Sequence, residues 1–206
     1  MKRFSLFSLF LMLSLLGFAQ RPYVCITPGA EMTLTQYDEN GKENGTAVTK
    51  IISATGSNGN YEITQDITVP TLGTMTTKIK VTNGMVDMSV GGLGIEASGD
   101  IPFVPSRLAV GLELNCGTVN VSMGGVSMVT NNISSNKVIG REELKTPAGT
   151  FKCYILEMIS EAKMIIKVKS TAKYWYARGL GVVKMENYDE KGKLVSSQVL
   201  TEVKGI

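Results

Sequence analysis

The sequence has 206 residues, a net charge of +3 at neutral pH and no histidine. Without histidine the chain cannot form a Ser-His or Cys-His nucleophile pair, a His-ligated haem site or a zinc site built on His ligands. The nearly balanced charge argues against a nucleic-acid partner held by bulk electrostatics.

The first twenty residues have the pattern of a secretory signal peptide. A short basic region precedes an almost unbroken apolar run from Phe4 to Leu16, and small residues follow it up to Ala19. The run is shorter than the roughly 20 residues of a transmembrane helix, and Cys25 stands in a poor lipobox. We predict a signal peptide over residues 1–19, cleaved near Ala19, and an exported periplasmic, extracellular or outer-surface protein with neither a lipid anchor nor a transmembrane span.

From Gln20 onward the composition is typical of an all-β protein. The chain is rich in Thr, Val, Ile, Ser and Gly, turn signals recur at short intervals, and no long helical periodicity is present. No linker divides the sequence. We therefore expect a single antiparallel β domain over residues 20–206, arranged largely as a meander and with little helix.

The first hairpin is predicted where alternating apolar and polar residues meet an Asn-Gly turn. Met32 to Tyr37 alternate as expected for a strand with one buried face, and Asn40-Gly41 is a strong hairpin signal because both residues tolerate positive φ. The return strand spans Thr46 to Ala54. Further strands are predicted at Tyr61 to Val69, Thr74 to Val81 and Met85 to Val90. An Asn83-Gly84 turn precedes the last of these strands. An irregular segment from Gly91 to Arg107 is then expected to cross one end of the sheet.

A second hairpin is predicted at VSMGGVSM, from Val121 to Met128. If Gly124-Gly125 form a two-residue loop, Met123 pairs with Val126 and Val121 pairs with Met128, which makes one face of the hairpin apolar. Met123 and Met128 would share that face, either as core residues or as flexible side chains that line an apolar pocket.

Methionine could in principle bind copper, because the chain has 11 methionines and thioethers are copper ligands. However, Met85 and Met88, the nearest pair in the mature chain, fall on opposite faces of a strand and cannot share an ion. We predict no metal site and no cofactor.

The C-terminal half continues the meander. Its last turn, Asp189 to Lys193, resembles the sequence of the first turn in the chain. Strands are expected at Asn136 to Leu144 and Thr150 to Ser160, joined by a type I turn at Thr146 to Gly149, then at Met164 to Ser170, Ala172 to Tyr176, Gly181 to Tyr188 and Leu194 to Val203.

Aromatic residues gather beside a basic residue between Lys173 and Gly181. One interpretation is a binding surface, in which Trp175, Tyr176 and Arg178 contact a ligand or a partner. The simpler interpretation is strand alternation, with Trp175 pointing inward and the two flanking tyrosines on the opposite face. No catalytic motif is recognisable, so we do not expect an enzyme.

Several segments resemble a known family. They are TPAGTFKCY (Thr146 to Tyr154), YWYARGLGVVKMENYDEKGKL (Tyr174 to Leu194), the opening stretch from Pro28 to Lys42, VPSRLAVG (Val104 to Gly111) and VSMGGVSM. On these residues the chain resembles the TapB-like family of exported β-rich proteins of Gram-negative bacteria, whose function is unknown. The resemblance implies a curved half-barrel similar to lipoprotein carriers, whose concave face holds acyl chains, and it supplies no catalytic residues.

Three cysteines follow the predicted signal peptide: Cys25, Cys116 and Cys153. In an oxidising compartment the simplest arrangement is one disulfide and one free thiol. The sequence does not show which two residues pair, and the candidate disulfide is Cys25–Cys153. The family resemblance implies a cysteine where this chain has Val81-Thr82, so Cys153 would lack its usual partner.

We hypothesise a non-enzymatic exported protein that binds an apolar ligand, such as a lipid or acyl chain, or an envelope protein on the concave face of its sheet. The alternative hypothesis is an accessory protein of envelope assembly or secretion, which acts by protein contacts through its edge strands or through the surface from Tyr174 to Arg178.

Overall fold

The computed structural model describes residues 21–87, 95–163 and 166–206. The predicted signal peptide and its cleavage site at Ala19 lie outside these residues, as do Met88 and Gly91 to Gly94. Apart from turns and irregular connections, the described residues form β-strands, and none of them belongs to a helix that is long and apolar enough to cross a membrane.

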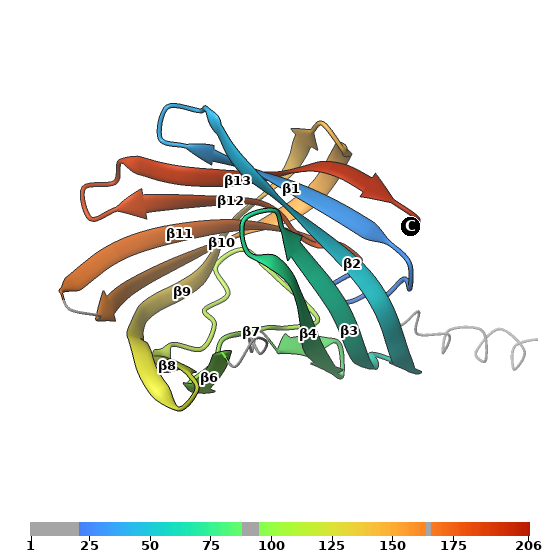
Figure 1. Ribbon diagram of the computed structural model, residues 1–206, viewed down its shortest axis with the longest axis horizontal. Coiled ribbons are helices and arrows are strands. Elements are labelled where there is room, and N and C mark those ends of the chain that lie inside the picture. Colours follow the sequence, from blue (N-terminus) through green and yellow to red (C-terminus); the bar gives the residue numbers. More distant parts are fainter. Residues whose placement is uncertain (1–20, 88–94, 164–165) are drawn as a thin grey trace, which may run out of the picture.

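Thirteen strands in the described residues belong to one sheet, and every pair of neighbouring strands is antiparallel (Figure 1). This confirms the predicted all-β, antiparallel fold. The strands are β1 (Glu31–Asp38), β2 (Glu43–Ser57), β3 (Asn60–Val69), β4 (Gly73–Thr82), β5 (Met85–Asp87), β6 (Ile95–Gly99), β7 (Phe103–Val104), β8 (Gly117–Met123), β9 (Val126–Thr146), β10 (Gly149–Lys163), β11 (Lys167–Ala177), β12 (Gly181–Asp189) and β13 (Leu194–Lys204).

The order of the strands brings the two ends of the chain together. It runs β6-β8-β9-β10-β11-β12-β13-β1-β2-β3-β4-β5-β7, so that β13 pairs with β1 and two meanders join into a single sheet. The sheet is strongly curved in the manner of a half-barrel (Figure 1). Its two edge strands, β6 and β7, are consecutive in the sequence and only Asp100 to Pro102 separate them.

The segment Ile95 to Val104 therefore closes the curled sheet, and we call it the closing segment. Its first part pairs with β8 and its last part pairs with β5. Sequence reasoning expected an irregular crossing between Gly91 and Arg107; the described part of that range contains two short strands instead. Their pairing partners are far apart in sequence, which explains why local sequence patterns did not indicate them.

Bulges curve the long strands. The β9–β10 ladder shifts register between Ile155 and Leu156 and again between Ile159 and Ser160, and the ladders of β1, β2, β8, β11 and β12 contain similar shifts. A bulge adds a residue to one strand, bends it and increases its twist. Strands β9 and β11 are also continuous across places where the sequence pattern predicted interruptions.

The predicted hairpin at Gly124-Gly125 is confirmed for its two innermost pairs. Met123 pairs with Val126, Ser122 pairs with Ser127, and both glycines have positive φ (57° and 80°). The predicted pairing of Val121 with Met128 is wrong: Val121 lies opposite Val129, because a bulge shifts the register between Val121 and Ser122.

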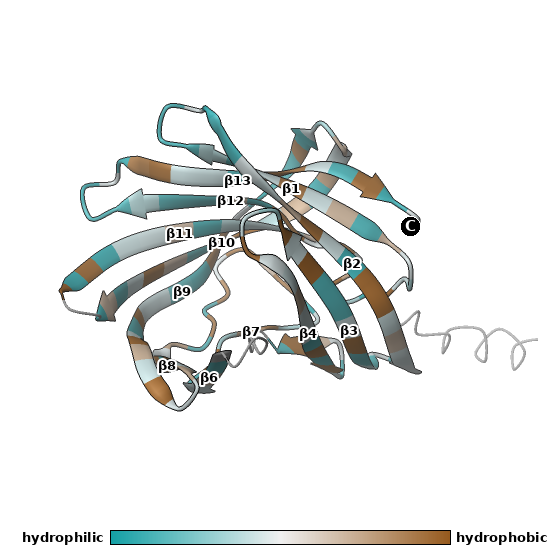
Figure 2. Ribbon diagram, in the orientation of Figure 1, coloured by the Kyte–Doolittle hydropathy of each residue, from teal (hydrophilic) through white to brown (hydrophobic). Residues whose placement is uncertain are grey.

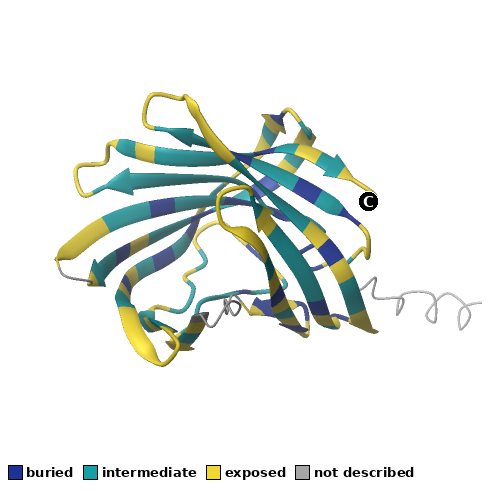
Figure 3. Ribbon diagram, viewed as in Figure 1, coloured by how far each residue is buried: buried dark blue, intermediate teal, exposed yellow. Residues whose placement is uncertain are grey.

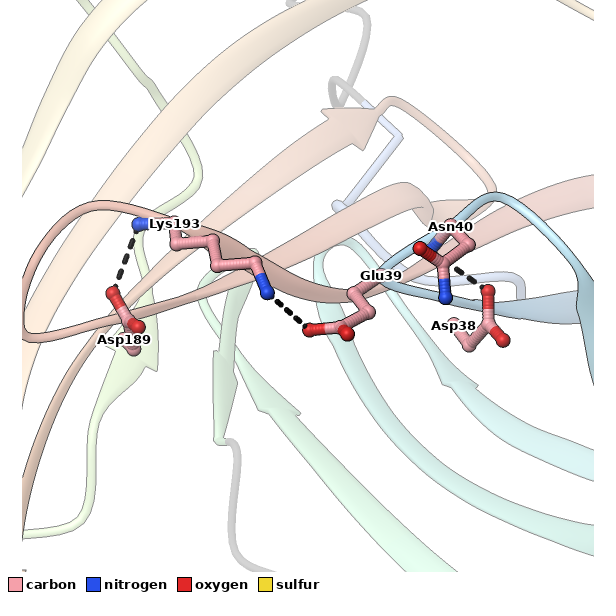
Figure 4. Close-up of polar contacts among 5 residues, drawn as sticks. All are labelled: Asp38, Glu39, Asn40, Asp189 and Lys193. Atoms are coloured by element: carbon pink, nitrogen blue, oxygen red, sulfur yellow. Dashed lines mark hydrogen bonds and ion pairs between the residues drawn. The ribbon is translucent and has the colours of Figure 1, made fainter.

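The two turns with similar sequences adopt the same conformation. Asp38 and Asp189 each accept hydrogen bonds at Oδ1 from two backbone N–H groups of their own turn, and Gly41 and Gly192 both have a φ of 77°. The turns lie side by side because β1 pairs with β13, and Lys193 Nζ contacts Glu39 Oε2 across them at 2.7 Å (Figure 4). The ion pair between Lys193 and Glu39 is thus a consequence of the pairing of β1 with β13.

One end of the curled sheet is filled by the segment that precedes β1. The Tyr23 ring packs edge-on against Tyr154 and Tyr176, with ring centroids 6.4 Å apart in both pairs. The Arg178 guanidinium lies 4.5 Å from the centroid of the Tyr23 ring and donates hydrogen bonds to the carbonyls of Arg21 and Ser106. This packing ties three distant parts of the chain together, and buried positions are dispersed along the strands around it (Figure 3).

All three cysteines are free thiols in the structure, so the candidate disulfide Cys25–Cys153 is not formed. Cys25 and Cys153 are fully buried in the core, whereas Cys116 is exposed. Burial, assisted by the nearby Glu142 carboxylate, raises the pKa of the Cys153 thiol to about 11. At neutral pH Cys153 is therefore a protonated, shielded thiol of low reactivity.

The fit of the closing segment can be tested with a glycine substitution. A Cβ on Gly99 would stand 2.2 Å from the Thr118 carbonyl oxygen, at a φ of +96°. We expect Gly99→Ala to destabilise the protein by about 3 kcal/mol, from steric overlap and positive φ together. Gly41→Ala, at a φ of +77° with nothing within 4 Å, should cost only about 1 kcal/mol. Urea unfolding followed by the fluorescence of Trp175, the single tryptophan, measures both; equal losses would contradict the described register of β6 against β8.

The state of the cysteines can be tested by thiol labelling at pH 8. The folded protein should react rapidly at one thiol, Cys116, and Cys116→Ser should remove that reaction. Unfolding without a reductant should release the other two thiols. If unfolding released none, Cys25 and Cys153 would be joined by a disulfide in solution.

Candidate functional site

An apolar pocket lies inside the curled sheet, between four adjacent strands and the chain that closes them. Its volume is ≈ 190 Å³. Strands β8 to β11 supply most of its wall, and the closing segment and the stretch that leads into β8 supply the rest. The lining residues are Pro102, Phe103, Leu114, Val119, Val121, Asn131, Ile133, Asn136, Leu156, Met158, Tyr174 and Tyr176.

Strand alternation explains which side chains reach the pocket. Val119 and Val121 are two residues apart on β8 and therefore share a face. Their face is continued on the next strands, because Val119 lies opposite Asn131 and Leu156 lies opposite Tyr174. The pocket wall is thus a run of directly paired side chains across neighbouring strands.

Asn115 fixes the closing segment over the pocket. Its side-chain amide forms two hydrogen bonds with backbone groups: Phe103 N donates to Asn115 Oδ1 (3.2 Å), and Asn115 Nδ2 donates to the Ile101 carbonyl (3.0 Å). Asn136 Nδ2 in turn donates to the Asn115 carbonyl (3.2 Å). These bonds join the closing segment to the chain that leads into β8, and that chain to β9, and they hold Phe103 in the pocket wall.

The pocket carries no formal charge at neutral pH. None of its lining residues is acidic or basic. Burial raises the pKa of Tyr174, and burial together with the neighbouring Tyr174 raises the pKa of Tyr176. Both phenols therefore stay protonated, and the pocket offers an uncharged, mostly apolar surface.

The size of the pocket limits what can enter it. At ≈ 190 Å³ it exceeds the roughly 150 Å³ engineered cavity that holds benzene. It is smaller than the roughly 300 Å³ at which sites for drug-sized ligands begin. The pocket thus fits a small apolar molecule, or the end of a longer chain.

Two asparagine side chains of the pocket differ in their hydrogen bonding. Asn136 is bound to Asn115, as described above. Asn131 Oδ1, in contrast, is a buried atom without a hydrogen-bond partner in the structure. A buried acceptor that lacks a partner is costly and uncommon in folded proteins.

The aromatic residues predicted as a binding surface are mostly buried. Tyr176 lines the pocket, whereas Trp175 lies on the opposite face of β11. There the indole N–H of Trp175 donates a hydrogen bond to Glu142 Oε1 (2.5 Å), and Lys184 Nζ lies 4.5 Å from the centroid of the Trp175 ring. The alternation was predicted correctly, but Tyr174 and Tyr176 are the side chains that face the pocket. Arg178 is exposed, and it holds the closed end of the sheet through its contacts with Tyr23 and two carbonyls.

The predicted methionine pair lies at an exposed hairpin tip, which we call the β8–β9 tip. The exposed fractions of Met123, Val126 and Met128 are 51%, 63% and 54%. Figure 2 and Figure 3 show this hairpin as an apolar and exposed part of the sheet. Met123 and Met128 do not line the pocket itself, but Met123 continues the face of β8 that carries Val119 and Val121.

Sequence reasoning missed most of the pocket, including Asn131. One signal was available: Asn131 and Asn132 interrupt a segment otherwise rich in β-forming residues, and asparagine is depleted in strands. Among the described residues no group of three or more Cys, Asp or Glu side chains could hold a metal ion.

Comparison with solved structures shows the same fold in two bacterial proteins. One is from Bacteroides fragilis and is inferred to be exported, with a YmcC-like fold; it shares 19% identity with this chain, with a TM-score of 0.75 over 90% of this chain and 100% of its own. The other, from Parabacteroides distasonis, is inferred to be a lipoprotein; it shares 18% identity, with a TM-score of 0.75 over 90% of this chain and 99% of its own. Similarity at this level of identity establishes the fold alone.

No curated protein matches the sequence significantly. The family model that matches is the DUF3108-like model, over residues 71–200. This match does not bear out the narrower TapB-like name suggested by the sequence motifs. It covers more than half of the sequence, including the closing segment and strands β8 to β12 around the pocket, and the chain thus belongs to the DUF3108-like family.

Proposed function

We propose that this protein is an exported, non-enzymatic binding protein whose pocket between β8 and β11 takes a small apolar ligand or the apolar end of a longer one. The observation that carries the proposal is the uncharged pocket of ≈ 190 Å³, which its own side chains leave unfilled. The signal-peptide pattern and the exported and lipoprotein descriptions of the two structural neighbours support a place in the cell envelope.

Binding is favoured over catalysis by the chemistry of the pocket wall. General acid–base or nucleophilic catalysis needs a group that changes its protonation or attacks near neutral pH. The lining residues provide amides, hydrocarbon side chains and two tyrosines whose pKa values are raised. Such a wall can hold an apolar group but has no group suited to transform it.

A longer ligand would extend from the pocket toward the β8–β9 tip. Val119, Val121 and Met123 alternate along β8, which contains no extra residue of its own, and therefore share one face. Val126 lies opposite Met123. The apolar surface that begins in the pocket thus continues to side chains that are half exposed, and an acyl chain too long for the pocket would lie along it.

The pocket can be filled by a single substitution. Val121→Phe adds a phenyl ring to the pocket wall and should weaken the binding of octanol, measured by isothermal titration calorimetry, by about tenfold or more, because the ring occupies the space of the ligand. The matched control is Val195→Phe on β13, where the valine is 48% exposed and the ligand affinity should not change.

Thermal unfolding of both variants shows whether they remain folded. If Val121→Phe is folded and binds octanol as tightly as the unaltered protein, the pocket is not the binding site. If the unaltered protein binds no apolar ligand at all, the proposed function is wrong.

A second candidate function is docking on an envelope protein through the β8–β9 tip. Three apolar side chains, each more than half exposed, gather there, and surface concentrations of apolar side chains often mark interaction sites. The surface from Tyr174 to Arg178, expected earlier to serve this purpose, is a poor candidate because Trp175 and Tyr176 are buried.

Docking at the tip can be tested by site-specific photo-crosslinking in the producing cells. A crosslinker at Val126 should give one discrete adduct, and the double substitution Met123→Ser and Met128→Ser should abolish it. A crosslinker at Ile52, which is 46% exposed elsewhere on the sheet, serves as the control. Identical patterns at both positions would argue against a specific partner at the tip.

A further inference from the structure

Two rows of paired side chains lead from the pocket wall across the inner face of the curled sheet. The first row crosses five neighbouring strands, β10 to β13 and then β1 (Figure 1), and consists of Leu156, Tyr174, Met185, Gln198 and Gln36. Directly opposite residues on neighbouring strands point to the same face. Because Leu156 and Tyr174 line the pocket, the whole row lies on the inner face.

The second row runs beside the first and begins at Met158, which also lines the pocket. Its directly paired members are Met158, Ala172, Asn187 and Ser196. Asn187 Nδ2 donates a hydrogen bond to Ser196 Oγ at 3.1 Å. Both rows therefore change from apolar side chains at the pocket to amides and a hydroxyl on β12, β13 and β1.

The polar ends of the two rows carry no formal charge, in contrast to the outer face of the same strands. The row that lies between them points outward and contains Glu157, Lys173 and Glu186, with Lys173 Nζ 3.6 Å from Glu157 Oε2. The first charged residue that either inner row reaches is Asp38, opposite Ser196 on β1. Its Oδ1 accepts two backbone N–H groups of its own turn. A ligand over the inner rows thus meets neutral hydrogen-bonding groups and no Lys or Arg.

Gln36 and Gln198 offer unused hydrogen-bonding capacity at the end of the first row. Both residues are half-buried, and neither amide forms a hydrogen bond within the described part of the chain. Neither belongs to the fully buried side-chain atoms that lack a partner there, so their amide atoms are accessible. Gly45 lies opposite Gln36 on β2, and a Cβ on Gly45 would have no heavy atom within 4 Å. The sheet therefore leaves open space beside the amides.

Hydroxyl groups match this surface better than charged groups do. A side-chain amide both donates and accepts hydrogen bonds, as a hydroxyl does. A phosphate or carboxylate would lose its hydration without a cation to compensate it. Neighbouring strands lie ~4.8 Å apart, so Gln198 is about 10 Å from Tyr174 along the row. One molecule with an apolar tail in the pocket would reach the amides with its head.

From this geometry we infer that the ligand is an uncharged amphiphile with a hydroxyl-rich head, such as a sugar, whose hydroxyls form hydrogen bonds with the amides of Gln36 and Gln198 while its alkyl tail occupies the pocket. The inference rests on the proposed function, since it concerns the polar end of a ligand held in that pocket. A longer tail would extend along β8 toward the β8–β9 tip, away from the head.

The inference is tested first with the unaltered protein and four ligands that share an octyl tail. Isothermal titration calorimetry, below the concentrations at which micelles form, compares octyl glucoside with octanol, octyl phosphate and octylammonium. Octyl glucoside should bind about tenfold more tightly than each of the others, as expected for one or two additional hydrogen bonds. If any of the three binds as tightly as octyl glucoside, the inference is overturned, while binding of octanol still supports the pocket.

The second arm removes the amides. The double substitution Gln36→Leu and Gln198→Leu keeps the approximate size of both side chains, so octyl glucoside should lose its advantage over octanol. Gln198→Ala is the milder variant, and it should reduce that advantage about threefold. The matched control is Ser197→Leu, because Ser197 is the next residue on β13 and points to the outer face; its ligand preference should equal that of the unaltered protein.

The variants separate the ways in which the inference can fail, once thermal unfolding has shown which of them are folded. A folded amide variant that keeps the full preference for octyl glucoside would show that the glutamines do not bind the head. If Val121→Phe weakens octanol but not octyl glucoside, the tail of the glucoside is not in the pocket, and the inference is again overturned. If the unaltered protein binds none of the four ligands, both the inference and the proposed function are wrong.

Discussion

The curled sheet depends on one short stretch of chain that pairs with both of its edges. The closing segment lies against β8 at one end and against β5 at the other, with Asp100 to Pro102 between. Unpaired strand edges attract other chains, and this segment pairs with the free sides of both β8 and β5. The close fit requires small residues: Gly99 lies against the Thr118 carbonyl, and Gly117 lies against the Asp100 side chain, whose Oδ2 accepts a hydrogen bond from Thr118 N.

Closure of the sheet creates an interior, and the filling of that interior determines where the pocket lies. The aromatic cluster around Tyr23 occupies one end, where Arg178 is bound to its ring and to backbone carbonyls. Tyr176 belongs to both regions, since it packs against Tyr23 and lines the pocket. The pocket is thus bounded by the core on one side and by Phe103 of the closing segment on another, both of which are held by specific hydrogen bonds.

The sequence was most informative where structure is determined locally. Glycine at positive φ and an Asp side chain that binds its own turn are enough to specify the turns at Gly41 and Gly192, and both were located correctly. The antiparallel fold also followed from local alternation. Register was predicted only as far as the first bulge: the pairs at Met123 and Ser122 were right, and the next pair was wrong by one residue.

The pocket was less predictable because it depends on contacts between distant segments. Alternation shows that Tyr174 and Tyr176 share a face, but it does not show which face the rest of the chain will cover. Trp175 was expected to point inward, whereas the pocket lies on the face of the two tyrosines. The same limit applies to the closing segment, whose short strands exist because two remote edges are available to pair with them. Local propensity carries no information about either feature.

The bulge at Val121 and Ser122 connects the pocket with the exposed tip. Side-chain direction has a period of two residues in a strand, so an extra residue on β9 reverses the faces of the residues beyond it. Because the extra residue is on β9 and not on β8, Met123 stays on the face of β8 that carries Val121, and Val126 lies opposite Met123 across the two-residue turn. Met123 and Val126 at the tip therefore extend the pocket wall, and a ligand that outgrows the ≈ 190 Å³ pocket would cover the same surface that a protein partner would need.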